Sequence, residues 1–319
     1  MYGVMGVTKA GDPSFTEASF GWLLTNWCNY SCSYCSSKGW LIDRADRSKY
    51  RAALMVPFRL KNIDVDFTVD LAGGEPTIHP YLNRIVRSLV DIGRCKKVVI
   101  NTNLSRSVRY YTNLIKHEKV LVVASYHAEY DNQAFRDKCF ILKGDGLRVH
   151  INISDDRAHW QNTLDVIKFC TDNDIAYGLN SLYSTAYKTI EYSSECYDTF
   201  KHLDVPTKGK YDYTFADGST DQMTSFEIRQ RELHKFVGYR CRTMKYQIEF
   251  DGTFRKECNS ERLQTMFPKK KDLDAPIVCA RQQGCDCDVM LRYYKEKPTH
   301  FHTLNNNDKT QQDKHNVHT

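Results

Sequence analysis

The sequence predicts an α/β fold: a curved, partial (β/α)6 barrel followed by a small α+β domain that carries clustered cysteines. Strand-like and helix-like patterns alternate over 19–183, which favours parallel strands joined by right-handed crossovers. Six strand candidates are too few for a closed eight-stranded barrel, so the sheet is expected to stay open. Five of the 12 cysteines fall between Cys241 and Cys287, beyond the alternating part.

The six strand candidates are short apolar or alternating runs. They are Ser19–Asn26, Asp64–Ala72, Lys97–Thr102, Lys119–His127, Gly146–Ser154 and Ile175–Tyr183. Because parallel strands end at one edge of a barrel, polar residues at their carboxyl ends are candidates for a functional site.

Helical spacing is clear in two of the intervening segments. Residues 80–92 place five apolar side chains on one face, with Pro80 suited to the first turn and Gly93 to the C-terminal cap. Those five are Leu82, Ile85, Val86, Leu89 and Val90. Residues 158–172 carry a similar stripe of Trp160, Leu164 and Ile167.

The remaining segments predict smaller units. Residues 1–18 are expected to be a loose lead-in, and 184–236 a linker that ends in a bridging helix over 224–236. In that helix Thr224 can cap and Glu227 completes a capping box. Residues 237–298 are expected to form the cysteine-bearing domain, with a β-hairpin over 244–256. The polar tail 299–319 is expected to be disordered.

Composition narrows the class of protein. Of 319 residues, 41% are hydrophobic and 26% are charged, which is typical of a globular chain. No uncharged apolar run reaches about 18 residues, which excludes a membrane-spanning helix, and the first twenty residues lack a secretory signal. A cytoplasmic location is therefore expected, and 12 cysteines there favour metal or redox chemistry over disulfides.

Cys28, Cys32 and Cys35 stand in the loop that follows the first predicted strand, in the sequence CNYSCSYC. Three thiolates at this spacing can each bind one iron of a [4Fe–4S] cluster, and the fourth iron then stays open for a ligand. A structural zinc ion is the alternative, although zinc would need a fourth ligand and this loop offers none.

These residues resemble the signature of the radical S-adenosylmethionine (SAM) enzymes, C-x3-C-x-Φ-C, with Tyr34 as the aromatic residue before the last cysteine. The second predicted strand is followed by Gly73-Gly74-Glu75-Pro76-Thr77, which matches the GGEP motif of the same family. Two glycines permit a close backbone approach to a ligand, and Glu75 adds a carboxylate. The resemblance covers roughly residues 19–183.

The resemblance implies a radical mechanism. The methionine end of SAM would chelate the open iron, and the GGEP segment would hold its amino group. The reduced cluster would then cleave SAM to a 5′-deoxyadenosyl radical, which takes a hydrogen atom from the substrate. An electron donor such as a flavodoxin or a ferredoxin is also implied.

Later strand ends supply further candidates for binding SAM, since family members use polar residues there. Asn103, Ser125 and Asn152 follow or end the third, fourth and fifth predicted strands. Each is equally consistent with an ordinary hydrogen-bonded residue at a strand end. His127 is a candidate for contact with the substrate or for acid–base catalysis.

Five cysteines in the last third of the chain form a second group. Cys241 precedes and Cys258 follows the predicted hairpin, which would bring both thiols to one metal ion. Cys279, Cys285 and Cys287 come later. The layout resembles the Twitch and SPASM extensions of radical SAM enzymes, which implies one auxiliary [4Fe–4S] cluster held by four of the five. A zinc knuckle is the alternative.

The sequence leaves three classes of substrate open. Resemblance to Twitch and SPASM proteins favours oxidation or crosslinking of a peptide side chain, or oxidation or epimerisation of a small metabolite. A nucleotide or nucleic acid is the third class, since residues 224–298 carry 16 Lys and Arg against 11 Asp and Glu. A zinc-stabilised module that binds nucleic acid is the non-enzyme alternative.

Overall fold

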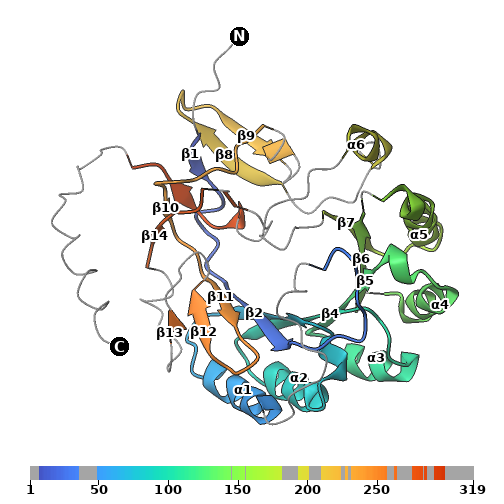
Figure 1. The fold of residues 1–319 in the computed structure, drawn as a ribbon. Helices are drawn as coiled ribbons and strands as arrows, with labels where there is room; N and C mark the ends of the chain where they lie inside the picture. Colours follow the sequence, from blue (N-terminus) through green and yellow to red (C-terminus); the bar gives the residue numbers. More distant parts are fainter. Residues whose placement is uncertain are drawn as a thin grey trace, which may run out of the picture.

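The computed structural model consists of an open parallel sheet, helices on its outer side and a second, smaller sheet (Figure 1). It describes residues 7–35, 49–144, 146–154, 156–181, 193–200, 210–223, 227–228, 231–256, 262–263, 275–282, 284–285 and 291–298. Within these residues, no helix is long and apolar enough to cross a membrane.

Six parallel strands form the barrel wall, and each predicted strand matches one of them within three residues at either end. They are β2 (Ala18–Thr25), β3 (Phe67–Gly73), β4 (Cys95–Thr102), β5 (Val120–Tyr126), β6 (Leu147–Ile153) and β7 (Tyr177–Ser181). Neighbours in sequence are neighbours in the sheet, and β2 and β7 do not pair among the described residues. The predicted open, partial barrel is therefore confirmed.

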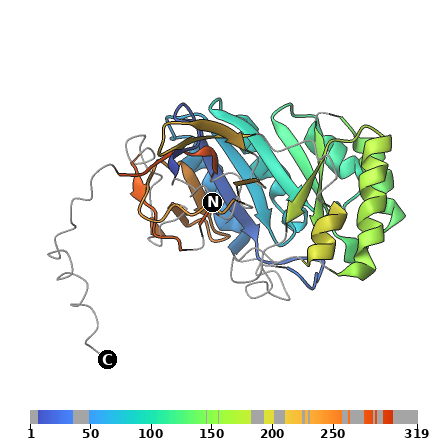
Figure 2. The same cartoon turned by 90° about the horizontal axis from the view of Figure 1, so that it is seen from above.

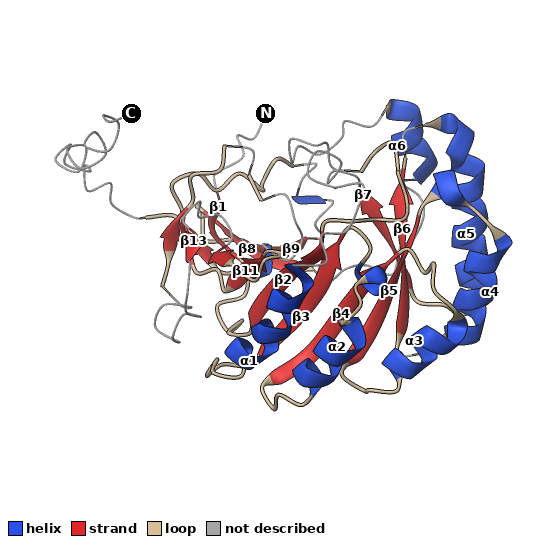
Figure 3. Cartoon of the chain, turned by 60° about the horizontal axis from the view of Figure 1, so that its bottom comes forward, coloured by secondary structure: helices blue, strands red, loops and turns tan. Residues whose placement is uncertain are grey.

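Helices cover one face of these strands, as Figure 3 shows. They are α1 (Val56–Leu60), α2 (Leu82–Val90), α3 (Val108–Ile115), α4 (Gln133–Leu142) and α5 (Trp160–Asp172), with α6 (Ser194–Phe200) beyond them. The described residues also form the 3-10 helices η1 (Lys49–Met55), η2 (Pro76–Ile78), η3 (Ala128–Tyr130) and η4 (Arg157–His159). Side chains along each strand alternate between the two faces of the sheet. In β2, Phe20, Trp22 and Leu24 are fully buried on the helix-covered face, whereas the residues between them face the inner side.

The two helices were predicted with different accuracy. Four of the five residues predicted for the inner face of α2 are buried, and Val90 packs against the core. The helix begins at Leu82, so Pro80 lies outside its first turn, and Asp91 rather than Gly93 caps its end. In α5 the buried residues are Thr163, Val166, Ile167 and Cys170, so the predicted stripe was only partly right.

A hairpin of β11 (Lys245–Ile248) and β12 (Phe254–Lys256) forms as predicted, with Gly252 in its turn at φ +80°. β11 pairs in parallel with β2, so the hairpin and β13 (Arg262–Leu263) extend the barrel sheet to nine strands. The hairpin predicted for the cysteine-bearing segment 237–298 therefore continues the barrel sheet.

The second sheet gathers strands from both ends of the chain (Figure 2). Its strands are β1 (Val7–Ala10), β8 (Tyr211–Phe215), β9 (Thr220–Met223), β10 (Arg240–Cys241), β14 (Ile277–Val278) and β15 (Lys295–Glu296). Two predictions are corrected here. The supposed lead-in contributes β1, which pairs with β8 and β15, and the supposed linker contributes α6, β8 and β9.

The predicted bridging helix over 224–236 is confirmed only in part: residues 227–228 are helical, whereas residues 231–234 form turns. Thr224, its proposed cap, and the predicted disordered tail 299–319 lie outside the described residues.

A buried histidine makes the stability of this fold depend on pH. His79 follows η2, is 3% exposed, and lies edge-on to the Tyr50 ring at 4.4 Å. Its Nδ1 accepts from the Tyr81 N–H (3.2 Å), and no described residue bonds its Nε2. Burial lowers the pKa of His79 to about 4 from an ordinary 6.5, because the charged ring would lose its water.

We therefore expect stability to fall below pH 6.5, because the unfolded chain binds this proton more readily than the folded one. Between pH 7 and pH 5 the loss from this group should be about 2 kcal/mol. Urea unfolding of the wild type and of His79→Asn at both values measures it. An equal loss in both proteins would show that His79 is not the cause.

Candidate functional site

The candidate site lies where the loops after β2, β3, β4 and β5 meet at the carboxyl edge of the barrel sheet. Cys28, Cys32 and Cys35 follow β2 directly, as predicted. Cys32 is buried, whereas the other two are partly exposed. In the described part of the chain, no three His, Cys, Asp or Glu side chains already converge to hold a metal ion.

The three thiols nevertheless influence one another electrostatically. Burial, with smaller contributions from nearby Glu129, Cys35 and Cys28, raises the pKa of Cys32 to about 12. Burial is also the main reason that the pKa of Cys28 is raised, with Glu75 and Cys35 adding to it. A metal ion binds these residues as thiolates, so its binding would release their protons and depend on pH.

The glycine pair packs against the start of the cysteine loop. Gly74 N donates to Thr25 O (2.8 Å), and the next residue, Glu75, donates its N–H to Trp27 O (2.9 Å). Gly73 has φ +132°, a conformation that side chains disfavour. A Cβ on Gly74 would overlap Trp27 O. The close approach expected of these glycines is therefore made to the chain's own backbone.

We expect Gly74→Ala to destabilise the protein by about 1–3 kcal/mol, because the added methyl group has no space beside the Trp27 carbonyl. Chemical denaturation measures the loss. Gly93→Ala is the matched control, because an added Cβ there meets nothing within 4 Å. Equal stability of the two variants would contradict this packing.

Glu75 lies inside the structure, 1% exposed, rather than on the open side of the sheet. Its Oε1 accepts from the Thr77 N–H (3.0 Å) and from the hydroxyls of Thr77 and Thr102 (2.7 Å for Thr102). Its Oε2 accepts from Asn103 N (2.7 Å). Burial raises the pKa of Glu75, and these donors oppose the rise. The carboxylate thus ties the end of β3, through the turn that begins at Pro76, to the end of β4.

The three polar candidates at later strand ends differ in how they are engaged. The Asn103 side chain donates to Asn29 Oδ1 (2.9 Å) and accepts from Ser105 N (3.1 Å). Asn152 is 7% exposed and donates to Tyr126 O (3.0 Å). Ser125 is half-buried, and no described side chain bonds its hydroxyl. Ser125 is therefore the candidate with the most freedom to contact a ligand.

His127 and Tyr34 contact each other. The Tyr34 hydroxyl lies 2.9 Å from His127 Nδ1, and the same nitrogen lies 3.5 Å from Cys32 Sγ. Their rings are parallel within 14°, with centroids 6.0 Å apart. Burial lowers the pKa of His127 to about 4, which keeps the ring neutral near pH 7. The histidine thus faces the cysteine loop.

In the second cysteine group, Cys241, Cys279 and Cys285 are described and buried, whereas Cys258 and Cys287 lie outside the described residues. Cys279 N donates to Tyr239 O (2.9 Å), which extends the pairing of β10 with β14 by one residue. Cys279 therefore shares a sheet face with Cys241. Cys285 N bonds His234 O (2.8 Å).

Two buried lysines approach Cys241. Lys295 is 1% exposed and stands directly opposite Cys241 in the β10–β15 pair, so both side chains point to one face. Burial raises the pKa of Cys241, and the positive charges of Lys295 and Lys256 act in the opposite direction. Buried cations of this kind favour thiolate over thiol.

Sequence reasoning missed Asn29, Glu129 and Tyr130, which contact the cysteine loop or its neighbours. One signal for the last two was available: they lie two and three residues after His127, which ends a predicted strand. No motif distinguishes them, and a glutamate in a surface loop is ordinarily solvated.

Comparison with curated proteins finds a partial match. The chain is 35% identical over 106 residues to the probable GTP 3′,8-cyclase of Saccharolobus islandicus strain L.S.2.15 / Lassen #1. The matched part is 33% of this chain and 33% of that protein, and strain Y.G.57.14 / Yellowstone #1 gives the same values. The chain thus matches about a third of the length of these relatives. No protein-family model matches it.

Solved structures share the architecture more widely. A polyhistidine-tagged anSMEcpe with bound AdoMet is 14% identical, with a TM-score of 0.50 over 78% of this chain and 77% of that chain. Native anSMEcpe with bound AdoMet gives the same identity and TM-score over 77% of each chain. At this identity the likeness shows the fold, and it agrees with the open parallel barrel described above.

Proposed function

We propose that this chain is a radical SAM enzyme, in which Cys28, Cys32 and Cys35 hold a [4Fe–4S] cluster whose open iron binds SAM. The observation that carries the proposal is the packing of the CNYSCSYC loop against the GGEP segment at adjacent strand ends. When bound, the reduced cluster and SAM supply a 5′-deoxyadenosyl radical, and the reaction begins with hydrogen abstraction from the substrate.

The superfamily has independent support. The partial barrel is shared with AdoMet-bound structures, and about a third of the chain is similar to probable GTP cyclases. The donor set also fits an iron–sulfur cluster, because thiolates are its usual ligands.

The roles of the neighbouring residues follow from their contacts. Gly73 and Gly74 let the end of β3 pack closely against the start of the cysteine loop. Pro76 begins the turn η2, in which the Thr77 N–H donates to Glu75. The hydroxyl of Ser125 is the side-chain group proposed to contact SAM. Asn103 and Asn152 fix strand ends beside it through their hydrogen bonds with Asn29 and Tyr126.

We further propose an auxiliary metal centre of the Twitch type at Cys241, Cys279 and their neighbours in sequence. Support comes from the shared sheet face of these two thiols and from Lys295 beside them, which offsets the negative charge of a thiolate-held metal. The remaining ligands are proposed to come from among Cys258, Cys285 and Cys287, with four of the five cysteines binding the centre. An iron–sulfur cluster is preferred to zinc because the first site already requires the iron–sulfur machinery.

The proposed substrate is a peptide side chain or a small metabolite that is oxidised, with the auxiliary cluster accepting an electron. A nucleotide is the second candidate, and the similarity to probable GTP cyclases favours it. The proposed electron donor is a flavodoxin or a ferredoxin.

Anaerobic purification followed by metal analysis tests the function. We expect brown protein with about eight irons per chain, and formation of 5′-deoxyadenosine after dithionite and SAM are added. Colourless protein that holds only zinc and leaves SAM intact would contradict the enzyme proposal and favour a zinc-stabilised nucleic-acid-binding module. Adding GTP, or a pool of small peptides, then compares the two substrate classes by which one stimulates SAM cleavage.

A further inference from the structure

One short segment, residues 127–130 at the end of β5 and in η3, makes most of the described contacts to residues 30–34 of the cysteine loop. The two segments are 93 to 99 positions apart in the sequence. We call residues 127–130 the clamp. Its contacts are distributed over the loop on both sides of Cys32.

Two loop amides are bonded by clamp side chains. Ser31 N donates to the Tyr130 hydroxyl (2.8 Å), and Ser33 N donates to Glu129 Oε2 (2.9 Å). The Ser33 hydroxyl donates to the other oxygen of Glu129. These bonds fix the backbone immediately before and after Cys32.

Ring contacts complete the set. Tyr30 stacks on Tyr130 with centroids 4.0 Å apart and planes within 8°. On the other side of Cys32, the Tyr34 hydroxyl bonds His127 Nδ1 (2.9 Å). Four of the five residues from 30 to 34 are thus bonded or stacked by the clamp, and the fifth, Cys32, lies 3.5 Å from His127.

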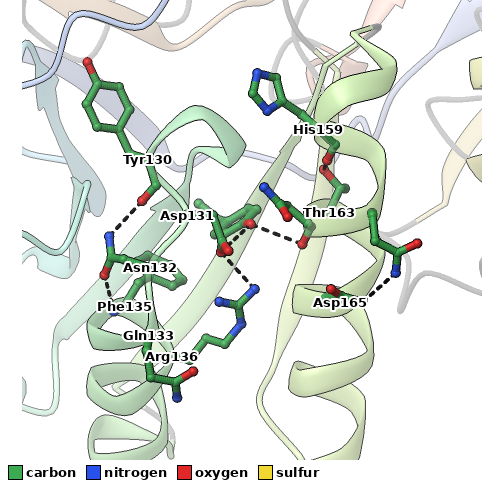
Figure 4. Close-up of polar contacts among 12 residues, drawn as sticks. Tyr130, Asp131, Asn132, Gln133, Phe135, Arg136, His159, Thr163 and Asp165 are labelled. Atoms are coloured by element: carbon green, nitrogen blue, oxygen red, sulfur yellow. Dashed lines mark hydrogen bonds and ion pairs between the residues drawn. The ribbon is translucent and has the colours of Figure 1, made fainter.

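The two residues that follow the clamp anchor it to β5 and α4, as Figure 4 shows. Asp131 accepts from the Tyr126 hydroxyl (2.7 Å) and pairs with Arg136 (2.8 Å). Asn132 donates to Tyr130 O (2.7 Å) and caps α4 by accepting from Phe135 N (2.9 Å). The clamp therefore stands on β5 and α4 rather than on the loop that it holds.

We propose that the clamp holds the backbone of the cysteine loop ordered before any metal is bound, with Glu129 and Tyr130 as positioning residues. The physical reason is entropy: ordering each loop residue costs about 1–2 kcal/mol, which the metal need not supply if the loop is already ordered. Partners outside the ligand set typically change metal affinity by about 10–100-fold. The metal part of this inference rests on the proposed function.

Glu129 also brings a carboxylate close to Cys32, since it bonds the amide and the hydroxyl of the adjacent Ser33. A negative charge beside a cluster disfavours the addition of an electron, so it makes the cluster harder to reduce. Glu129→Gln keeps the shape and can still bond Ser33 N and its hydroxyl, but it removes the charge. This variant separates the electrostatic effect from the positioning effect.

Hydrogen exchange in metal-free protein tests the ordering. We expect amides in residues 29–35 to exchange at least about tenfold faster in Glu129→Ala and in Tyr130→Ala than in the wild type, because their acceptors are lost. The control Asp137→Ala removes an exposed carboxylate of α4 that bonds only Gln133 among the described residues. It should leave exchange in the loop unchanged. Unchanged exchange in both clamp variants would overturn the proposal, whatever the metal content.

Iron release to a chelator tests the consequence in reconstituted protein. We expect about tenfold faster release from Glu129→Ala and Tyr130→Ala, and wild-type release but easier reduction in Glu129→Gln. Faster exchange without faster iron release would overturn the link to metal retention. If the wild type takes up no iron at Cys28, Cys32 and Cys35, the proposed function is contradicted instead. The exchange experiment would still decide whether the clamp orders the loop.

Discussion

Cys32→Ala is expected to abolish 5′-deoxyadenosine formation and to lower the iron content by about four atoms per chain. Cys32 is the most buried of the three thiols and lies between the two halves of the loop that the clamp holds. Loss of one of three ligands leaves a cluster with two open irons, which is not expected to survive purification. Metal analysis and product detection after dithionite and SAM measure both effects.

The matched control is Cys139→Ala, which removes another buried thiol, from α4. We expect it to lose some stability, as small core deletions do, and to keep its iron and its SAM cleavage. Cys258→Ala should spare SAM cleavage and block turnover of the substrate. If Cys32→Ala kept full iron and activity, the triplet would not be the cluster site.

Glu75→Ala is expected to destabilise the metal-free protein by about 4 kcal/mol. The change removes one buried acceptor group from the amides of Thr77 and Asn103 and from two threonine hydroxyls. Each buried donor left without a partner carries a desolvation cost of about 1–3 kcal/mol, and the costs are not additive. Urea unfolding measures the loss.

Glu75→Gln should fall between this variant and the wild type, since its amide oxygen can replace only part of the acceptor set. Asp172→Asn is the control, because Asp172 is an exposed partner of Lys168 (2.7 Å) and such pairs contribute about 0–1 kcal/mol. Wild-type stability of Glu75→Ala would mean that the buried carboxylate does not join the strand ends.

The barrel was predictable because its signals are local. Phe20, Trp22 and Leu24 alternate with inward-facing residues along β2, and the inner face of α2 follows the helical period. The position of the cysteine loop, directly after β2, was predictable from the apolar run before it. These features require no knowledge of residues far away in the sequence.

The parts that sequence reasoning missed depend on distant partners. β1 is only four residues long and is a strand because it pairs with β8 and β15, about 200 to 290 positions away. The GGEP glycines pack on Thr25 and Trp27, and Glu75 is occupied by the chain's own donors. A motif identifies which residues matter, but it does not say which atoms they contact.

The most direct measurement is electron paramagnetic resonance of the reduced, oxygen-free Cys258→Ala protein, before and after SAM is added. With the auxiliary site disabled, we expect one [4Fe–4S] signal whose shape changes when SAM binds the open iron of the cluster at Cys28, Cys32 and Cys35. An absent signal, or one that SAM leaves unaltered, would contradict a SAM-binding cluster in this loop.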